Sequence, residues 1–189
     1  ASGITPSGEF HIGHLREILT GDMITRACKD AGMDAEFVFI VDSADPLRKV
    51  YPFLSDEYEQ YIGCALATIP APDENGNPGS DGRNYAEHFL EPFLAALEQI
   101  DVRPRIIDNY TSYANGEFAE KSRIACEKAD EIREIIERVS SRELAPDWFP
   151  YNPYGHNGSL DGVTVTSFEW PYVHWTQDGT PGKSDLNKA

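Results

Sequence analysis

The hydrophobic pattern at the start of the chain gives a loop, then a helix, then a strand. Residues 15–32 place apolar side chains near helical spacing, and Gly32 is a C-terminal stop. The predicted stripe is Leu15, Ile18, Leu19, Met23, Ile24 and Ala27. The run EFVFIV at 36–41 is typical of a buried strand. With a first strand at or before Ser2, this order predicts a βαβ unit.

Helical spacing recurs in the middle of the chain. It predicts a short helix over 55–68, a second over 85–100 with its stripe at Phe89, Phe93, Leu94 and Leu97, and a third over 117–139. The third has five candidate buried positions, Ala119, Ile124, Ile132, Ile135 and Ile136.

The intervening segments have other signatures. Residues 70–84 are rich in Pro, Gly, Asn and Asp and predict an exposed loop. RPRIIDNY at 103–110 predicts a strand. VTVTSFEW and PYVHWT predict a β hairpin near 160–178. We expect five aromatic residues to form its small core, namely Tyr154, Phe168, Trp170, Tyr172 and Trp175.

Composition narrows the classes of protein. The chain has 189 residues and is 40% hydrophobic, enough for a real core. It contains no membrane-spanning run, its first residues give no expectation of a signal peptide, and Cys28, Cys64 and Cys126 form no CxxC pair. A reduced, cytoplasmic protein is therefore expected. The net charge of −16 argues against nucleic-acid binding by the average surface, although a larger enzyme can carry such contacts elsewhere.

The segment TPSGEFHIGH carries the candidate chemistry. His11 and His14 flank Gly13 where a loop becomes a helix, so both rings can face a phosphate at the helix N-terminus. Gly13 allows a nucleotide to approach the backbone. The imidazoles can then donate to charge that develops during nucleotidyl transfer. The alternative is two surface histidines at the start of a helix.

In this context the HIGH motif is the signature of class I aminoacyl-tRNA synthetases, and GITPSGEFHIGHLRE resembles their lysyl-tRNA synthetase family. The similarity continues in DSADPLRKV at 42–50, YAEHF at 85–89 and GEFAE at 116–120. It implies a Rossmann-like parallel sheet of the HUP type, with an inserted helical region and a small β hairpin. It also implies ATP-dependent activation of lysine, with Mg²⁺, and transfer to tRNA(Lys).

The resemblance assigns roles to individual residues. His11 and His14 are implied to be catalytic, and the ATP site is implied to contain Pro6, Ser7, Gly8, His11, Gly13 and His14. The lysine site is implied to contain Gly3, Thr5, Asp42 and Asp45. The two aspartates follow a strand, where open α/β sheets bind ligands, but an Asx turn that caps the loop explains them equally well. Arg48 and Lys49 either meet phosphate or tRNA, or form a solvated basic pair.

Two features depart from the family. Many members carry a zinc-binding β element within 151–185, where this chain has Gly155, Gly158, Thr176 and Thr180 at the corresponding places. Because none of these supplies thiolate or imidazole, we expect no zinc. The second family signature, a KMSKS-type loop, is also absent.

The resulting hypothesis divides the chain into 1–54, the first part of the nucleotide-binding domain; 55–150, a mostly helical insert; and 151–189, a β element without metal ligands. The rest of the catalytic domain and the anticodon-binding domain are expected outside it. The predicted function is that of a lysine–tRNA ligase. The alternatives are another class I synthetase or HIGH-type nucleotidyltransferase, or a nucleotide- or tRNA-binding fragment without turnover.

Overall fold

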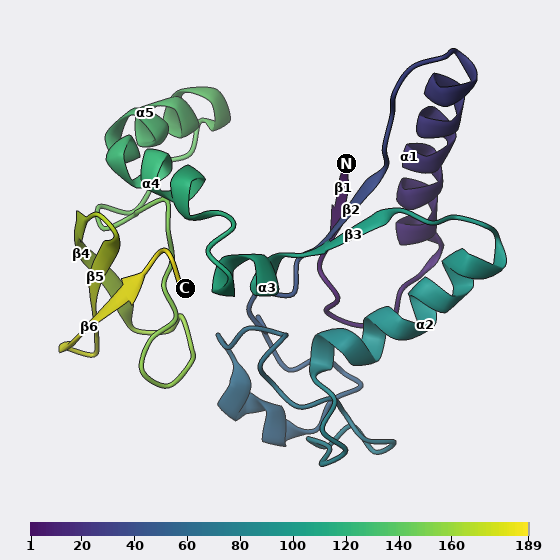
Figure 1. Ribbon diagram of the computed structural model, residues 1–189. Coiled ribbons are helices and arrows are strands. Elements are labelled where there is room, and N and C mark those ends of the chain that lie inside the picture. Colours follow the sequence, from purple (N-terminus) through teal and green to yellow (C-terminus); the bar gives the residue numbers. More distant parts are fainter. Residues whose placement is uncertain (189) are drawn as a thin grey trace. The chain divides into compact units, whose positions relative to one another are not determined.

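The structure is a computed structural model that describes residues 1–188. The chain forms two compact units, which join in sequence at Tyr110. In the first, β1 (Ser2–Ile4), β2 (Val38–Val41) and β3 (Arg105–Asp108) form a parallel sheet in the order β1-β2-β3 (Figure 1). The predicted Rossmann-like sheet is confirmed. The domain boundaries at 54 and 150 stay a prediction.

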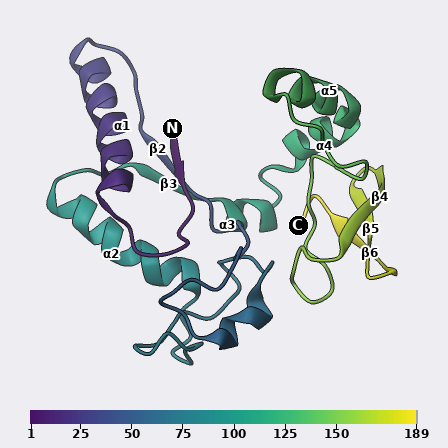
Figure 2. The same cartoon turned by 180° about the vertical axis from the view of Figure 1, so that it is seen from behind.

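Two helices cover one face of this sheet (Figures 1 and 2). Ile18 of α1 (Ile12–Asp30) and Phe93 of α2 (Tyr85–Gln99) pack with the strand side chains of that face, Ile4, Phe39 and Val41. The predicted α1 stripe is wrong at Met23 and Ile24, which are 68% and 60% exposed, and at Ala27, which is also exposed. The strands have only three or four residues, so at about 3.3 Å per residue they cannot cover a 19-residue helix that rises about 1.5 Å per residue.

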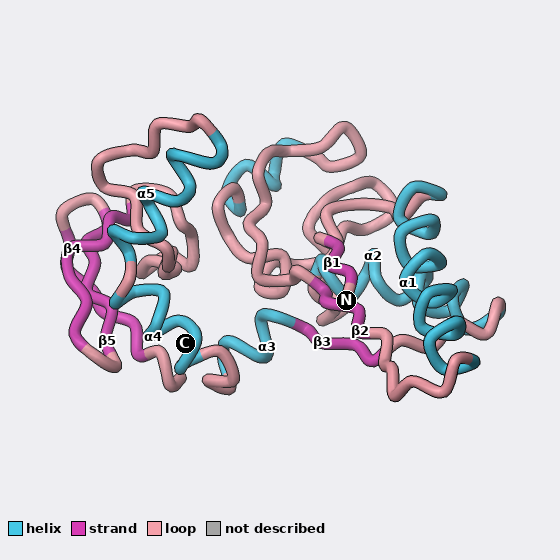
Figure 3. Tube along the Cα trace, turned by 90° about the horizontal axis from the view of Figure 1, so that it is seen from above, coloured by secondary structure: helices cyan, strands magenta, loops and turns pink. Residues whose placement is uncertain are grey.

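The segment between β2 and α2 is mostly irregular (Figure 3). The helix expected over 55–68 is only the 3₁₀ helix η1 (Asp56–Tyr61). It ends just before Gly63, whose φ of +84° is a left-handed conformation that glycine adopts readily. The residues between Gly63 and α2 form no helix, but several of them are buried. They belong to a cluster that includes Leu47, Tyr58, Cys64, Leu66, Ile69 and Tyr85.

The helix predicted over 117–139 is two helices, α4 (Ala119–Glu127) and α5 (Ala129–Ser140), which follow the short α3 (Asn109–Ala114). They meet at Lys128, although no Gly or Pro marks the break in the sequence. The expected burial is wrong for Ile124 and Ile135, which are 38% and 50% exposed. Spacing shows that a helix is amphipathic but not that a partner covers its apolar side.

In the second unit the predicted hairpin has a third strand. β4 (Val163–Glu169), β5 (Tyr172–Gln177) and β6 (Thr180–Asp185) form an antiparallel sheet (Figure 2). Asp178 and Gly179 make the tight turn, with φ of +50° and +83°, as is usual for an Asp-Gly hairpin. The aromatic core is only partly confirmed: Trp175 is buried, but Trp170 is 42% exposed, and the buried cluster is Cys126, Val173 and Leu186.

Across residues 1–188, no helix has both the length and the apolar character that a membrane span requires.

Candidate functional site

A cavity of about 730 Å³ lies in the first unit, beside the loop that follows the carboxyl end of β1. This is where open parallel sheets usually bind ligands. The segment after β1 supplies part of its lining, Thr5, Ser7, Gly8, Glu9, His11 and His14. The rest comes from residues between β2 and α2 and from α2 itself, Tyr51, Phe53, Pro72, Asp73, Glu74, Asn75, Gly76, His88 and Phe89.

His11 and His14 cap α1 with their own rings. The Gly13 N–H donates to Nδ1 of His11 at 3.0 Å, and the His11 N–H donates to Nδ1 of His14 at 3.1 Å. An Nδ1 that accepts a hydrogen bond carries no proton, so in the neutral rings the proton is on Nε2. The capping interpretation and the chemical one are therefore compatible, because each ring uses one nitrogen for the helix and keeps an Nε2–H donor.

The caps also occupy the backbone N–H groups of His11 and Gly13, which are therefore not free to bind phosphate. Gly13 leaves room for this arrangement, because a Cβ there would lie 2.8 Å from Cε1 of His11. The two imidazoles stack, with their centroids 4.0 Å apart. Burial, and secondly the nearby His11, lower the pKa of His14, and Glu17 opposes them. Since the pKa is lowered, His14 is neutral at pH 7.

A buried tyrosine of α2 holds the loop before the motif. The Tyr85 hydroxyl donates to the Ser7 carbonyl at 2.9 Å, and the Ser7 N–H donates to the Thr5 carbonyl at 2.8 Å. Pro6 of this turn is fully buried. Of the predicted ATP-site residues, the structure places Ser7, Gly8, His11 and His14 on the cavity, whereas Pro6 and Gly13 do not line it.

The loop 72–76 forms another wall of the cavity, where the sequence predicts only an exposed loop. Asp73 organises it by accepting the backbone N–H groups of Asn75 and Asn77, both at 2.8 Å, and these bonds lower the pKa of its carboxyl group. Gly76 has a φ of +79°, and a Cβ there would lie 2.4 Å from the Phe53 carbonyl oxygen. The sequence DENGN at 73–77 indicates an Asx-type turn. It does not indicate that the loop packs against Phe53, because that contact joins residues far apart in the chain.

The residues predicted to bind the amino-acid substrate lie together at the carboxyl edge of the sheet. Thr5 donates through its hydroxyl to Asp45 at 2.6 Å, and a Cβ at Gly3 would lie 3.1 Å from Oδ2 of Asp42. Burial, followed by the charge of Asp45, raises the pKa of Asp42. A partly buried carboxylate beside a second carboxylate suits a cationic ligand. Of these four residues, only Thr5 also lines the cavity.

A third strand supports this cluster. Asn109, directly after β3, donates to Oδ1 of Asp42 at 2.9 Å and accepts the Ala44 N–H at 2.8 Å. Ser43, 1% exposed, donates to Asp108 at 2.5 Å. Asn109 was not among the predicted site residues, although its position after a predicted strand was a usable signal. Because these hydrogen bonds link separate elements, they favour a ligand-site scaffold over a local Asx turn.

The basic pair after this cluster is exposed. Arg48 lies 3.8 Å from Asp45, with 74% of its side chain exposed, and Nζ of Lys49 lies 5.4 Å from the centre of the Tyr51 ring. Neither lines the cavity. Their suggested contact with phosphate or tRNA stays a prediction.

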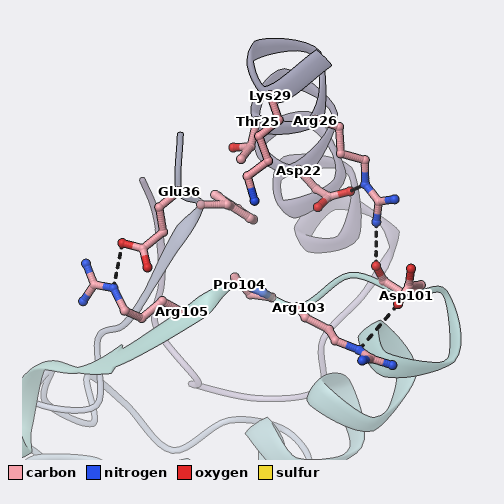
Figure 4. Close-up of a pocket in the computed structure, with 10 residues that line it drawn as sticks. Asp22, Thr25, Arg26, Lys29, Glu36, Asp101, Arg103, Pro104 and Arg105 are labelled. Carbon is pink, nitrogen blue, oxygen red and sulfur yellow. Dashed lines mark hydrogen bonds and ion pairs between the residues drawn. The ribbon is translucent and has the colours of Figure 1, made fainter. Parts of the chain in front are cut away.

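A second cavity, of about 540 Å³, lies at the amino end of the same sheet (Figure 4). It is lined by four cations, Arg26, Lys29, Arg103 and Arg105, and three carboxylates, Asp22, Glu36 and Asp101. Each guanidinium is paired: Arg26 with Asp22 at 2.6 Å, Arg105 with Glu36 at 2.8 Å and Arg103 with Asp101 at 3.5 Å. A bound anion would have to compete with these carboxylates.

In the second unit, a buried glutamine lies beside Gly155, one of the four positions that correspond to the family's zinc ligands. Gln177 is 6% exposed and donates to Oδ1 of Asn157 at 2.7 Å and to the Asp161 carbonyl at 2.9 Å. A Cβ at Gly155 would lie 2.3 Å from its Oε1. The absence of zinc stays a prediction, and stoichiometric zinc in purified protein would contradict it.

Comparison with known proteins gives a consistent result. The family described as "tRNA synthetases class I (K)" matches residues 1–189. The chain is 40% identical to a lysine–tRNA ligase of Picrophilus torridus over 188 residues, which cover 98% of this chain and 36% of that protein. For those of Archaeoglobus fulgidus and Thermoplasma acidophilum the identities are 42% and 37%, over 94% and 100% of this chain and 35% and 36% of the relatives. The chain thus spans about a third of the length of these relatives.

Proposed function

Because this chain belongs to the class I (K) family of tRNA synthetases, we propose that it is the part of a lysine–tRNA ligase that binds ATP and the α-amino end of lysine. The observation that carries the proposal is a pair of imidazoles, those of His11 and His14. They cap α1 and line a cavity beside the carboxyl end of a parallel strand. The relatives are named for lysine and tRNA.

In this proposal the 730 Å³ cavity holds ATP, with its phosphates toward the rings of His11 and His14. Ser7 and Gly8 border the nucleotide, and Pro6 and Gly13 act indirectly, by fixing the turn and by making room for the His11 ring. Among the described residues that line the cavity, none is lysine or arginine. Neutral donors therefore meet the triphosphate, and Mg²⁺ supplies the positive charge. The carboxylate of Glu9 would offer an oxygen ligand of the kind that Mg²⁺ prefers.

The α-ammonium group of lysine is assigned to the acidic cluster. Asp42 and Asp45 attract a cation, Thr5 is held by its hydrogen bond to Asp45, and the missing side chain of Gly3 leaves space beside Asp42. The lysine carboxylate then attacks the α-phosphorus of ATP. The bond from that phosphorus to the bridging oxygen breaks, and pyrophosphate leaves.

His11 and His14 stabilise this step through their Nε2–H groups, which donate to α-phosphate oxygens as negative charge develops. No protein nucleophile is needed, because the substrate carboxylate attacks. The chemistry depends on positioning and on charge stabilisation. We assign transfer of lysine to tRNA(Lys) to a protein as long as the relatives. A cytoplasmic location is also part of the proposal.

The test is exchange of pyrophosphate into ATP with each amino acid in turn, in protein of the length that the relatives have. Exchange with lysine is expected. Exchange with arginine or glutamate but not lysine would overturn the amino-acid assignment. ATP binding without exchange for any amino acid would favour the competing hypothesis of a nucleotide-binding fragment. For residues 1–189 alone we expect weak nucleotide binding and little or no charging of tRNA.

A further inference from the structure

A third imidazole lies on the same cavity and belongs to no recognised motif. His88 is in the second turn of α2, far in sequence from His11 and His14, and it lines the cavity with them. Its main-chain N–H donates to the Asn84 carbonyl at 3.1 Å, which leaves the ring free of any role in capping α2. The HIGH pattern gives no reason for a histidine here.

The two ring nitrogens of His88 have different surroundings. Nδ1 is fully buried, and within residues 1–188 it has no hydrogen-bond partner. The residue as a whole is only half-buried, so another edge of the ring lines the cavity. A buried N–H without an acceptor is costly and rare. The favoured form therefore carries its proton on Nε2 and leaves only a lone pair buried at Nδ1.

The charge of the ring follows from the same geometry. An imidazolium would bury a second N–H at Nδ1. Burial and the nearby Arg83 lower the pKa of His88, and Asp81 and Glu91 act in the opposite direction. The ring is therefore neutral at pH 7, and its one N–H donor is on Nε2.

The neighbours of His88 suit a flat, uncharged group. Phe89 lies edge-on to it with centroids 4.8 Å apart, Phe53 lies 5.6 Å from Phe89, and Tyr51 stacks on Phe53 at 5.7 Å. All of these residues line the cavity. Asp73 and Glu74 also line it, and their charges disfavour phosphate nearby. Aromatic rings beside a neutral donor match a heterocyclic base with acceptor nitrogens.

We propose that His88 binds the base of the nucleotide, with its Nε2–H donating to a ring nitrogen of adenine. This rests on the proposed function, because it presumes that the cavity holds ATP. His88 then contributes to specificity and takes no part in bond making. Guanine, with a proton on N1, presents a different pattern of acceptors.

Two matched substitutions test the donor. In His88→Gln the side-chain amide nitrogen reaches the position of Nε2, whereas in His88→Asn it reaches only that of Nδ1. We expect calorimetric titration with MgATP to give nearly wild-type affinity for His88→Gln and about a 3- to 10-fold weaker one for His88→Asn, the range for one neutral hydrogen bond. Equal affinity of the wild type and both variants would overturn the inference.

Two further measurements do not depend on how the variants fold. Nitrogen NMR of the free wild-type protein should show His88 protonated at Nε2, and a proton on Nδ1 would overturn the inference. Of the 1-, 3- and 7-deaza analogues of ATP, one should bind wild-type protein about tenfold more weakly than ATP, as expected for one lost hydrogen bond. Equal binding of all three would reject the base contact and leave the ATP site intact. If wild-type protein binds no ATP, the proposed function fails first.

Discussion

At the amino end of the first unit's sheet, each guanidinium on the cavity touches a carboxylate, whereas the carboxyl-end cavity has three imidazoles and, among its described lining residues, no lysine or arginine. The amino-end cavity has more charged side chains, and its three guanidinium groups are paired with carboxylates. The carboxyl-end cavity keeps donors that the fold does not use, on His11, His14 and His88. Unused polar groups, more than the number of charges, therefore distinguish a ligand site from a network of ion pairs.

The largest expected effect comes from removing an unused donor while keeping the cap. In His11→Asn, the amide oxygen can still accept the Gly13 N–H, as asparagine does at helix N-termini, but Nε2–H is lost. We expect turnover in lysine-dependent pyrophosphate exchange to fall about 100- to 1,000-fold. KM for ATP should change much less, because the donor acts mainly in the transition state. The matched control at the opposite end is Arg105→Gln, with an unchanged rate. An unchanged rate in folded His11→Asn would limit the ring to capping.

A smaller effect is expected from removing the charge of Asp42, which should weaken lysine binding but stabilise the fold. Asp42→Asn should weaken lysine binding about 10- to 100-fold, the value of one hydrogen bond to a charged group. The same change should raise the melting temperature at pH 7. Burial and Asp45 raise the pKa of Asp42 above 3.8 in the folded protein. The folded protein therefore loses stability as the pH rises from 3.8 through this raised pKa. Asparagine does not titrate, so the variant does not have this loss.

Two measurements check this prediction. Melting curves of wild type and Asp42→Asn should converge below pH 3.8, where both side chains are neutral. Asp22→Asn, at the amino end, should do the reverse: it breaks the pair with Arg26, lowers the melting temperature slightly and leaves lysine affinity unchanged. A lower melting temperature for Asp42→Asn at pH 7 would show that the fold itself needs this charge.

The sequence was sufficient for the parts of the site that are local in the chain. The turn before His11, the α1 helix and the strand before Asp42 follow from glycine positions and hydrophobic spacing. Loop 72–76 and His88 were not predicted as cavity walls, because only tertiary contacts bring them there. Hydrophobic spacing failed in another way at Met23 and Ile135, since it does not report how much of a helix its neighbours cover.

A third effect concerns the cap of His14. Its pKa is lowered, so the unfolded chain binds the proton more tightly, and stability present above about pH 6.5 is lost as pH falls below it. Protonation at Nδ1 also removes the acceptor of the His11 N–H. We expect a loss of about 1 kcal/mol or less, the size of one helix cap. His14→Asn should lack this part of the pH dependence in melts from pH 8 to 5.5, and identical curves would contradict the assignment.

The smallest effect is expected from an ion pair at the amino end. Arg105 lies 2.8 Å from Glu36, with 52% and 58% of the two side chains exposed. Exposed pairs contribute only about 0.2–1 kcal/mol, and Arg105→Gln should cost no more than that in urea unfolding. The difference should vanish in 1 M salt, where the screening length is about 3 Å. MgATP affinity should be unchanged, since the nucleotide is assigned to the opposite end. If Arg105→Gln weakened ATP binding about tenfold or more, the paired cavity would bind phosphate after all, and pairing would not distinguish the two ends of the sheet.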